Sequence, residues 1–503
     1  MKTFQKIILS TLSVLAIGCQ NDDESVKKSI NTDVNFSYKT SIKIGGEGAS
    51  EISAFDKISK KLFTVNVEAN QIAINDISDI NNPKKSNINL TSYGSPNSVA
   101  VLDGKLAVAV EATIKQNNGK ILLYNTSDNS LISEFTVGAL PDMVAFSPDG
   151  KTIISANEGE PNDDYTNDPE GTISIINIKS KAVTTLNFDA FEAQKKDLTS
   201  KGFRVFGPNA TLSQDVEPEY IAISDDSKTA WVSLQENNGI AKINLASKTI
   251  EAIYPLGFKD YNLAKNSMDA SDKDDKKELK NWPVKGIYQP DAIKYANING
   301  IDYIFSANEG DARDYKGFSE EVRMEDLTLD ETVFDASLNY LDKANLGRLK
   351  TTTTLGDANN DGKFEELYSY GARSFSVWSG DNGTLLYDSG NSIATETLKA
   401  TQSRFNDNDK RSDDKGAEPE SVEILNIGNE RYILFVGLER NDQVLMYDVT
   451  NPTSPLFLNI LSHDGDEGPE GLLAISAEDS PTGKALLVVS NEDSGTVTFY
   501  ENN

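Results

Sequence analysis

The chain has 503 residues, of which 38% are hydrophobic, so it is long enough to bury a substantial core in one large β domain or in two to three ordinary domains. Its 78 acidic residues against 48 basic ones give a formal net charge of −30. A surface this acidic repels nucleic acid and anionic lipid and favours cations, and no basic stripe interrupts it. We therefore expect no nucleic-acid partner.

The N-terminus predicts a lipoprotein signal peptide over residues 1–18, because a positively charged start precedes an apolar run over 7–18 that is too short to span a bilayer. The run ends at Cys19 in a sequence (LAIGC) that resembles a bacterial lipobox, in which this cysteine becomes the lipid-modified first residue. Residues 20–24 (QNDDE) resemble the export signal that sends lipoproteins of Bacteroidota to the outer surface. We expect a lipid-anchored outer-membrane protein that faces the cell exterior or the periplasm, with 19–34 as an acidic tether.

An ordinary secretory peptide with an incidental cysteine is the alternative interpretation of this N-terminus. Cys19 is the only cysteine in the chain and stands where lipidation needs it. For the same reason no disulfide is expected within one chain.

One pattern returns seven times along the rest of the chain: a carboxylate or amide, an apolar strand, a second strand and then a glutamate. The residues that open the seven units are Glu51, Asn97, Asp142, Glu219, Asp291, Glu420 and Glu470. The residues that close them are Glu68, Glu111, Glu158, Glu236, Glu309, Glu439 and Glu492. A unit this small cannot bury its own apolar face, so its recurrence predicts a repeat architecture.

Four strands fit each unit, as in unit four, with strands expected over 219–223, 228–235, 239–245 and 249–254. The seventh unit has only three, and the alternating segment 36–44 belongs to no other unit, so we expect it to supply the missing outer strand. The expected fold is all-β: a seven-bladed β-propeller over residues 35–503, closed by an N-terminal strand, with long loop insertions on one face. An array of β-sandwiches is the alternative, but it does not explain the strand count at the two ends.

Two units carry long insertions, over residues 159–171 in unit three and 310–373 in unit five, and long connectors over 190–214 and 257–289 follow units three and four. In a propeller blade, the start of the first strand and the end of the second lie on the same face. We therefore expect the opening residues, the closing glutamates and the insertions to gather around one mouth of the central channel.

Carboxylates held this close in a reduced dielectric repel one another, so they must bind cations, take up protons or pair with Arg and backbone N–H groups. Repeated polar residues also hydrogen-bond neighbouring blades, and we assign most of the closing glutamates to that role. Function is expected for the clusters in units three to six. The candidate metal ligands there are Glu158, Asp163, Asp164, Glu309, Asp311 and Glu420. The candidate ligand-binding residues are Arg313, Asp314, Arg373, Glu219 and Asp291.

Carboxylates, amides and carbonyls suit hard cations, so Ca²⁺ is the expected cofactor, whereas zinc or copper fits poorly in a chain with a single His. A separate calcium candidate lies in the insertion of unit five, where Asp357, Asn359 and Asp361 precede a glycine as in the first half of a calcium loop. The twelfth position of an EF-hand would require Glu but here holds Tyr368, so we expect Glu365 or Glu366 to substitute. A polar turn without metal is the alternative.

The residues exclude several catalytic schemes. His463 is the only histidine and lies in a polar loop, and there is no Gly-x-Ser-x-Gly elbow, dinucleotide fingerprint or phosphate loop. Metal-assisted hydrolysis remains, with carboxylates as metal ligands and Arg as an anion clamp. No catalytic residue is assigned.

Several long motifs make the chain resemble the choice-of-anchor I family, the bacterial relatives of mesenchyme-specific cell-surface glycoproteins. They include ANEGEPNDDY at 156–165, QDVEPEY at 214–220, ANEGDARDY at 307–315 and RSDDKG at 411–416. The resemblance covers nearly all of 36–501 and implies a surface-displayed propeller held by one of several kinds of anchor. Animal relatives are associated with biomineralising cells, and some bacterial members carry an alkaline phosphatase label.

The leading hypothesis is a surface lipoprotein that binds an extracellular ligand or partner at an acidic, calcium-containing channel mouth, for adhesion, scaffolding or capture. The alternative is a calcium-dependent phosphoesterase at the same rim, with Arg313 or Arg373 as the phosphate clamp.

Overall fold

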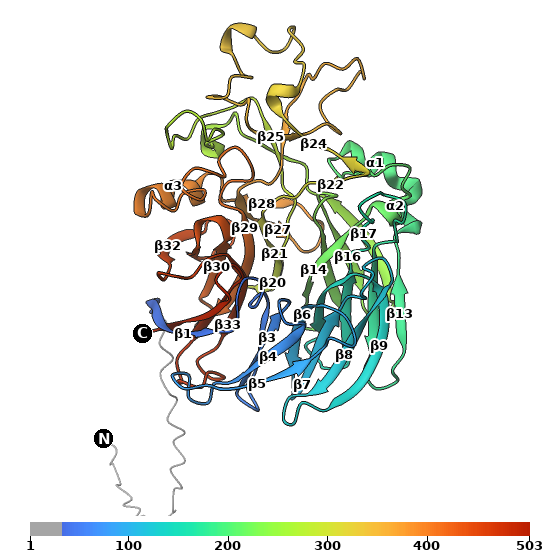
Figure 1. Cartoon of the computed structure of the whole chain (residues 1–503), viewed down its shortest axis with the longest axis vertical. Helices are drawn as coiled ribbons and strands as arrows, with labels where there is room; N and C mark the ends of the chain where they lie inside the picture. The colour runs from blue at the N-terminus through green and yellow to red at the C-terminus, as the bar shows by residue number, and fades with distance from the viewer. Residues whose placement is uncertain (1–32) are drawn as a thin grey trace, which may run out of the picture.

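The computed structural model describes residues 33–503, so the expected signal peptide over 1–18, Cys19 and most of the tether lie outside the described residues. Strands dominate the described part of the chain, as expected for an all-β protein (Figure 1). Within residues 33–503, no helix combines the length and the apolar character needed to cross a bilayer.

Six four-stranded antiparallel sheets follow one another along the chain in strand order. The first three are β2–β5 (Ser53–Asp56, Lys61–Asn66, Gln71–Asp76, Lys84–Asn89), β6–β9 (Pro96–Leu102, Lys105–Val110, Asn118–Asn125, Leu131–Ala139) and β10–β13 (Pro141–Phe146, Thr152–Asn157, Thr172–Asn177, Val183–Leu186). The next three are β14–β17 (Pro218–Ile223, Thr229–Leu234, Gly239–Asn244, Thr249–Pro255), β20, β21, β27 and β28 (Ile293–Ile298, Ile301–Asn308, Ser374–Ser379, Leu385–Asp388), and β29–β32 (Pro419–Asn426, Tyr432–Leu438, Gln443–Asp448, Leu456–Leu461).

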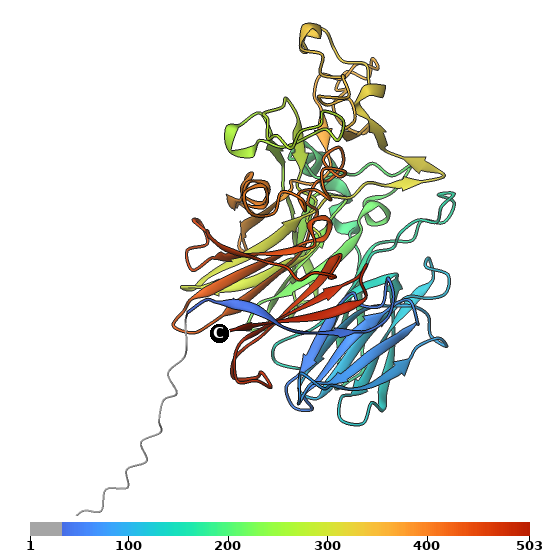
Figure 2. The same ribbon diagram turned by 60° about the vertical axis from the view of Figure 1, so that its left-hand side comes forward.

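A seventh four-stranded sheet joins the two ends of the described chain. It contains β33 (Pro469–Ile475), β34 (Leu486–Asn491), β35 (Thr496–Asn502) and β1 (Phe36–Lys43). Strand β1 pairs antiparallel with β35, with Phe36 opposite Asn502 and Lys43 opposite Thr496. The blue β1 therefore lies beside the red C-terminal strands in Figures 1 and 2, and the expected pairing of an N-terminal strand with the last unit is confirmed.

The first strands of the sheets contact one another in chain order: β2 with β6, β6 with β10, β10 with β14, β14 with β20, β20 with β29, β29 with β33, and β33 with β2. The second strands are mostly apolar beyond their first residue, as in β7 (KLAVAV) and β30 (YILFVGL), because both of their faces are buried. Core clusters form between neighbouring sheets, for example the cluster that contains both Val65 and Val108. This arrangement of antiparallel four-stranded sheets is β-propeller-like.

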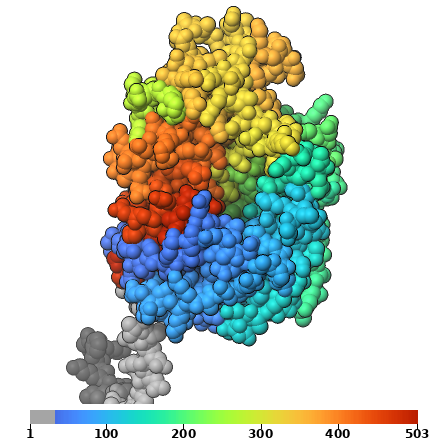
Figure 3. Space-filling view, in the orientation of Figure 1, coloured from blue at the N-terminus to red at the C-terminus, as the bar shows by residue number. Residues whose placement is uncertain are grey.

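The connector 257–289 and the insertion 310–373 together form a cap above the sheets, coloured yellow-green and yellow to orange in Figure 3. They hold β18 (Phe258–Asp260), η2 (Ala264–Asn266), β19 (Lys285–Ile287), β22 (Asp314–Tyr315), β23 (Phe318–Ser319), β24 (Glu321–Arg323), η3 (Met324–Asp326), η4 (Ala336–Leu338), β25 (Lys350–Thr352) and β26 (Tyr368–Ser369). Strand β19 pairs in parallel with β26, and Trp282 shares a small core with Met324 and Phe364.

Most of the remaining helices lie in connectors between the sheets. They are η1 (Asp189–Gln194), α1 (Lys195–Ser200), α2 (Leu212–Asp215) and α3 (Ser392–Ala400), whereas η5 (Glu439–Asn441) lies in the turn between β30 and β31 of one sheet. Together with the cap, the segments around α1, α2 and α3 lie on one side of the sheets in Figures 1 and 2.

Candidate cation-binding cavity

A cavity of about 490 Å³ lies where the first strands of the sheets begin. All seven opening residues line it: Glu51, Asn97, Asp142, Glu219, Asp291, Glu420 and Glu470. The closing glutamates Glu111, Glu158 and Glu492 also line it, together with Glu160. Residues that are hundreds of positions apart in the sequence thus share one cavity, as the repeat pattern predicted.

A local backbone feature places the opening residues in this cavity. Six of them directly follow a proline, namely Pro96, Pro141, Pro218, Pro290, Pro419 and Pro469. In five sheets the ladder register shifts directly after that proline, as between Pro141 and Met143, so that Asp142 has no partner on the neighbouring strand. A β-bulge bends the strand and re-aims the bulged side chain. The proline–acid pair is the sequence signal for this feature, and the sequence analysis did not use it.

The wall of the cavity is strongly acidic. Ten carboxylate residues line it (Glu51, Glu111, Asp142, Glu158, Glu160, Glu219, Asp291, Glu420, Glu470 and Glu492), against the single lysine Lys115 among the described residues. Lys115 is half exposed and lies 3.7 Å from Glu160, so it offsets little of the charge. The cavity therefore has a large excess of carboxylates over cations.

Burial and mutual repulsion raise the pKa of these carboxyl groups. Loss of solvation, followed by the charge of Glu492, raises the pKa of Glu51 to about 8. Burial also raises the pKa of Asp142 to about 6. The same cause holds the pKa values of four more opening residues, Glu219, Asp291, Glu420 and Glu470, well above their ordinary range. In the absence of cations, some of the carboxyl groups that line the cavity, such as that of Glu51, are therefore protonated near neutral pH.

Two side chains in the wall have buried polar atoms without a protein partner. Glu219 is only 7% exposed and its Oε2 accepts no hydrogen bond, and the buried Oγ of Ser421 has no partner either. Buried polar atoms are nearly always satisfied in folded proteins, by protein groups, water or a ligand. Both atoms are therefore available to a group bound in the cavity.

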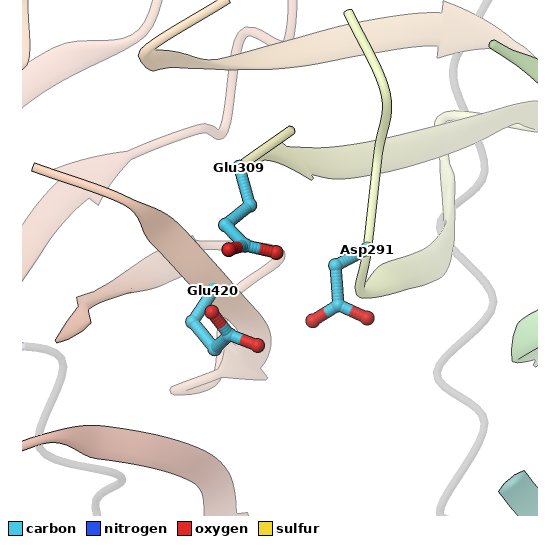
Figure 4. A group of neighbouring side chains, drawn as sticks. All are labelled: Asp291, Glu309 and Glu420. Atoms are coloured by element: carbon cyan, nitrogen blue, oxygen red, sulfur yellow. The ribbon is translucent and has the colours of Figure 1, made fainter. Parts of the chain in front are cut away.

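Three carboxylates converge, as Figure 4 shows: Asp291 before β20, Glu309 after β21 and Glu420 on β29. They offer one oxygen each within 4.8 Å of the others. Glu420 hydrogen-bonds Asp291, which requires a shared proton or a cation in its place. Glu309 also accepts hydrogen bonds from Gln235 Nε2 at 2.9 Å and from Lys415 Nζ at 2.5 Å.

A neighbouring acidic cluster of Glu309, Glu418 and Glu439 is already neutralised by basic side chains. Arg411 Nη2 lies 2.6 Å from one oxygen of Glu418, and Arg440 Nε lies 3.1 Å from the other. With Lys415 on Glu309, three cations face three carboxylates. We therefore assign Glu418 and Glu439 of this cluster to structure rather than to metal binding.

Several candidate residues lie outside the cavity. Asp163, Asp164, Asp311 and Asp314 are all exposed and none of them lines it. Asp164 forms an exposed ion pair with Lys316 at 2.5 Å, and Asp311 lies 3.7 Å from Lys415. The structure therefore places Glu158, Glu219, Asp291 and Glu420 in the wall of the cavity and Glu309 beside Asp291 and Glu420, but it does not bring these four aspartates there.

The two candidate arginine clamps are buried in the packing and do not line the cavity. Arg313 lies 2.9 Å from Asp215 Oδ1 and 3.0 Å from Glu217 Oε2, and its guanidinium lies over the Phe206 ring. Arg373 donates to the backbone carbonyls of Asp269, Ser412 and Asp414 at 2.6, 3.0 and 2.5 Å. Both guanidinium groups are thus used by the protein itself.

A separate group of carboxylates lies in the loop 357–366 of the cap, away from the cavity. Asp357, Asp361 and Glu365 offer oxygens within 4.8 Å of one another. Asp357 Oδ2 accepts from Gly362 N–H at 2.9 Å, and Asn359 donates to Glu365 Oε1 at 2.7 Å. Glu365 thus lies where a substitute for the missing twelfth-position glutamate was expected.

The comparisons with known proteins place a family domain over most of the chain. Residues 51–452 match the model of the Choice-of-anchor I domain. A 187-residue stretch is 34% identical to Gigasin-3a of Magallana gigas, and this match covers 31% of the chain and 64% of Gigasin-3a, just under two thirds of that protein.

Three solved structures that are similar to the chain over most of its length have low sequence identity to it. Kuenenia stuttgartiensis hydrazine synthase is 12% identical with a TM-score of 0.49, over 92% of this chain and 97% of that one. A chain of the mitotic checkpoint complex is 9% identical with a TM-score of 0.48, over 97% and 99% of the two chains. The β-propeller domain of Myceliophteria thermophila Cps50 (Swd1) is 9% identical with a TM-score of 0.47, over 92% and 100%.

Proposed function

Because the chain belongs to the choice-of-anchor I family, we propose that it is a lipid-anchored surface protein that binds an extracellular partner through divalent cations held in its acidic cavity. The anchor is a lipid on Cys19, in the lipobox-like sequence that ends the apolar N-terminal run. The protein then lies on the outer membrane and faces the cell exterior. Replacing Cys19 with Ala releases the protein from the membrane fraction under this proposal, and membrane retention of that variant would contradict it.

The body of the protein is a closed propeller of seven blades. Seven four-stranded sheets, the β1–β35 pairing and the contact between β33 and β2 support this architecture. Closure brings all seven opening residues to one axis and removes the exposed sheet edge at the ends of the chain.

The observation that carries the cation proposal is the carboxylate-rich wall, with ten carboxylates and one lysine, that contains a buried, unpartnered oxygen on Glu219. Ca²⁺ prefers six to eight oxygen ligands, and carboxylates supply them without a soft donor. Asp291, Glu309 and Glu420 are the ligands at their point of convergence, with Glu219 and Glu158 in the surrounding wall. A second Ca²⁺ binds Asp357, Asn359, Asp361 and Glu365 in the cap.

The cavity cation also explains how so acidic a site recognises a partner. A cation held by carboxylates on one side keeps coordination positions open toward the cavity, and a carboxylate or phosphate of the partner fills them. Adhesion, scaffolding or capture at the cell surface follows from such a bridge. The phosphoesterase alternative uses the same cation, but it has less support because Arg313 and Arg373 are held in structural contacts away from the cavity.

Calorimetric titration with calcium tests the proposal. We compare the chain with a cavity variant (Asp291→Asn, Glu420→Gln), a loop variant (Asp357→Asn, Asp361→Asn) and the control Glu251→Gln, an exposed carboxylate on β17. Each site variant should lose one class of calcium sites, and the control should lose none. Equal calcium binding by the cavity variant and the unmodified chain would overturn the proposal.

A phosphoester assay on the same variants separates the binder from the enzyme. Arg313→Ala is a poor test, because loss of activity would follow from the broken ion pairs alone. Calcium-dependent hydrolysis of a chromogenic phosphoester that disappears in the cavity variant, while the fold is retained, would favour the phosphoesterase.

A further inference from the structure

A second cavity, of about 1000 Å³, opens between the connector that contains α1 and the edge of the cap. Its wall includes Lys195, Lys196 and Lys201 from the α1 segment, Phe206 from the following loop, and Phe258 and Tyr368 from β18 and β26. We call it the basic groove. The basic groove shares no lining residue with the acidic cavity, so a ligand of the groove binds at a different site from the cation.

The charge of the basic groove is opposite to that of the molecule. Three lysines line it, whereas Glu192 is the only acidic residue of its wall among residues 33–503. Arg204 also lies in the wall, but its charge is paired with the buried Glu320. The whole chain carries a net charge of −30. A local positive field in such a protein attracts anions to one place on its surface.

The lysine amines of the groove are largely uncommitted. The side chain of Lys196 is exposed, and its Nζ has no hydrogen-bond or ion-pair partner within residues 33–503. Lys195 Nζ has only a 3.5 Å contact with the carbonyl of Ala210. Lys201 pairs with Asp197 at 2.7 Å, but both side chains are more than half exposed, and such pairs exchange readily with other anions.

Aromatic rings form the apolar part of the groove. Phe258 and Tyr368 pack edge to face with centroids 4.8 Å apart, and the Arg204 guanidinium lies 4.1 Å from the centroid of Phe206. Arg204 is 3% exposed and its buried Nε has no acceptor in the protein. Around the rings, Thr199, Ser200 and Thr354 add hydroxyl groups to the wall.

We propose that the basic groove binds an anionic ligand with a flat apolar face, such as a ring that carries a carboxylate or sulfate group. The lysine amines bind the anion, the rings of Phe258 and Tyr368 contact the apolar face, and the three hydroxyls accept hydrogen bonds from polar substituents. An acidic sugar unit and an aromatic acid share this chemistry.

Fluorescence titration of the full chain tests this site with two probes of similar shape: anilinonaphthalene sulfonate, which is anionic, and phenylnaphthylamine, which is neutral. The groove variant is Lys195→Gln, Lys196→Gln, Lys201→Gln. Its matched control is Lys179→Gln, Lys181→Gln, in the turn after β12. We expect the groove variant to lose roughly tenfold in affinity for the anionic probe, as loss of several exposed charge contacts implies, and to keep its affinity for the neutral one.

A ring variant and two competitors complete the test. Phe258→Leu should weaken both probes while the melting temperature confirms the fold. Displacement of the sulfonate by an oligo-uronate identifies a sugar ligand, and displacement by a benzoate alone identifies an aromatic acid. Equal sulfonate binding by the groove variant and its control, or displacement by neither competitor, would overturn the proposal.

Discussion

The opening residue of each unit combines two roles, because the backbone that aims it into the cavity also buries it. In β10 the bulge after Pro141 leaves Asp142 unpaired on the ladder, and burial then raises its pKa to about 6. The molecule thus keeps carboxyl groups in a place where ionisation costs free energy. Such an arrangement is retained when a cation compensates the charge.

Glu51 gives a pH-dependent prediction. Its pKa is about 8 in the folded protein and near 4.5 when unfolded, so the unfolded state loses its proton first. The stability linked to Glu51 is full below pH 4.5 and is lost as the pH rises through 8. In chelator, melting temperature should fall over this window, and Glu51→Gln should be more stable than the unmodified chain at its upper end, by about 1–3 kcal/mol.

The control for this experiment is the exposed Glu251→Gln variant, which should follow the unmodified chain at every pH. Calcium should remove most of the difference between Glu51→Gln and the unmodified chain, because a bound cation favours the ionised ring. If the melting temperature in chelator did not change with pH, the interpretation that burial raises the pKa of the carboxyl groups in the acidic cavity would be refuted.

Arg313 is expected to be a structural residue. Replacing it with Met leaves Asp215 and Glu217 buried without a counter-charge, which should lower the free energy of unfolding by about 3–5 kcal/mol. Lys316→Met removes an exposed pair with Asp164 and should cost less than about 1 kcal/mol. Denaturant titration measures both. Near-normal stability of Arg313→Met together with lost ligand binding would instead favour the anion-clamp role.

The loop 357–366 is an element that calcium should stiffen, since Phe364 anchors it in the core of the cap. Asp361→Ala should therefore abolish calcium-dependent protection of the cap from limited proteolysis, while the exposed Asp326→Ala, in the same insertion, should not. The cavity sites should titrate normally in both variants. If calcium still protected the cap of the Asp361→Ala variant from proteolysis, the loop would be a polar turn that binds no metal.

Strand β1 is the element on which closure depends. Ile42 on this strand is 4% exposed and packs with Leu62 and Val497, so Ile42→Ala should cost about 2–4 kcal/mol of unfolding free energy. Thr40→Ala, a half-buried position on the same strand, is the matched control and should cost under about 1 kcal/mol. If thermal unfolding showed equally small losses of stability for Ile42→Ala and Thr40→Ala, β1 would not be part of the closed arrangement of sheets.

At the scale of the whole molecule, much of the strand arrangement was predictable from sequence because it repeats. The recurring acid–strand–strand–glutamate pattern located the sheets, and segment 36–44 was correctly assigned to the last sheet. Convergence of the opening residues followed from that topology. The cavity draws on all seven units, including Glu51 and Glu470, which lie outside the clusters where function was expected.

Side-chain partners were not predictable in the same way. Asp215 and Glu217 lie about a hundred positions before Arg313, and only the folded connector brings them to its guanidinium. Likewise, Asp163 and Asp164 belong to a conspicuous acidic motif but lie on an exposed turn. No local pattern distinguishes an acid that faces the axis from one that faces solvent, apart from the proline that precedes most of the opening residues.

The central claim is that the acidic cavity binds a divalent cation. A crystal structure determined from crystals grown in millimolar calcium tests this claim most directly. The account predicts a cation in the cavity at 2.3–2.6 Å from carboxylate oxygens of Asp291 and Glu420, the distance range typical of calcium. It also predicts that the anomalous signal of the cation disappears from this point in the Asp291→Asn, Glu420→Gln variant. Only water between these carboxylates at saturating calcium would contradict the account.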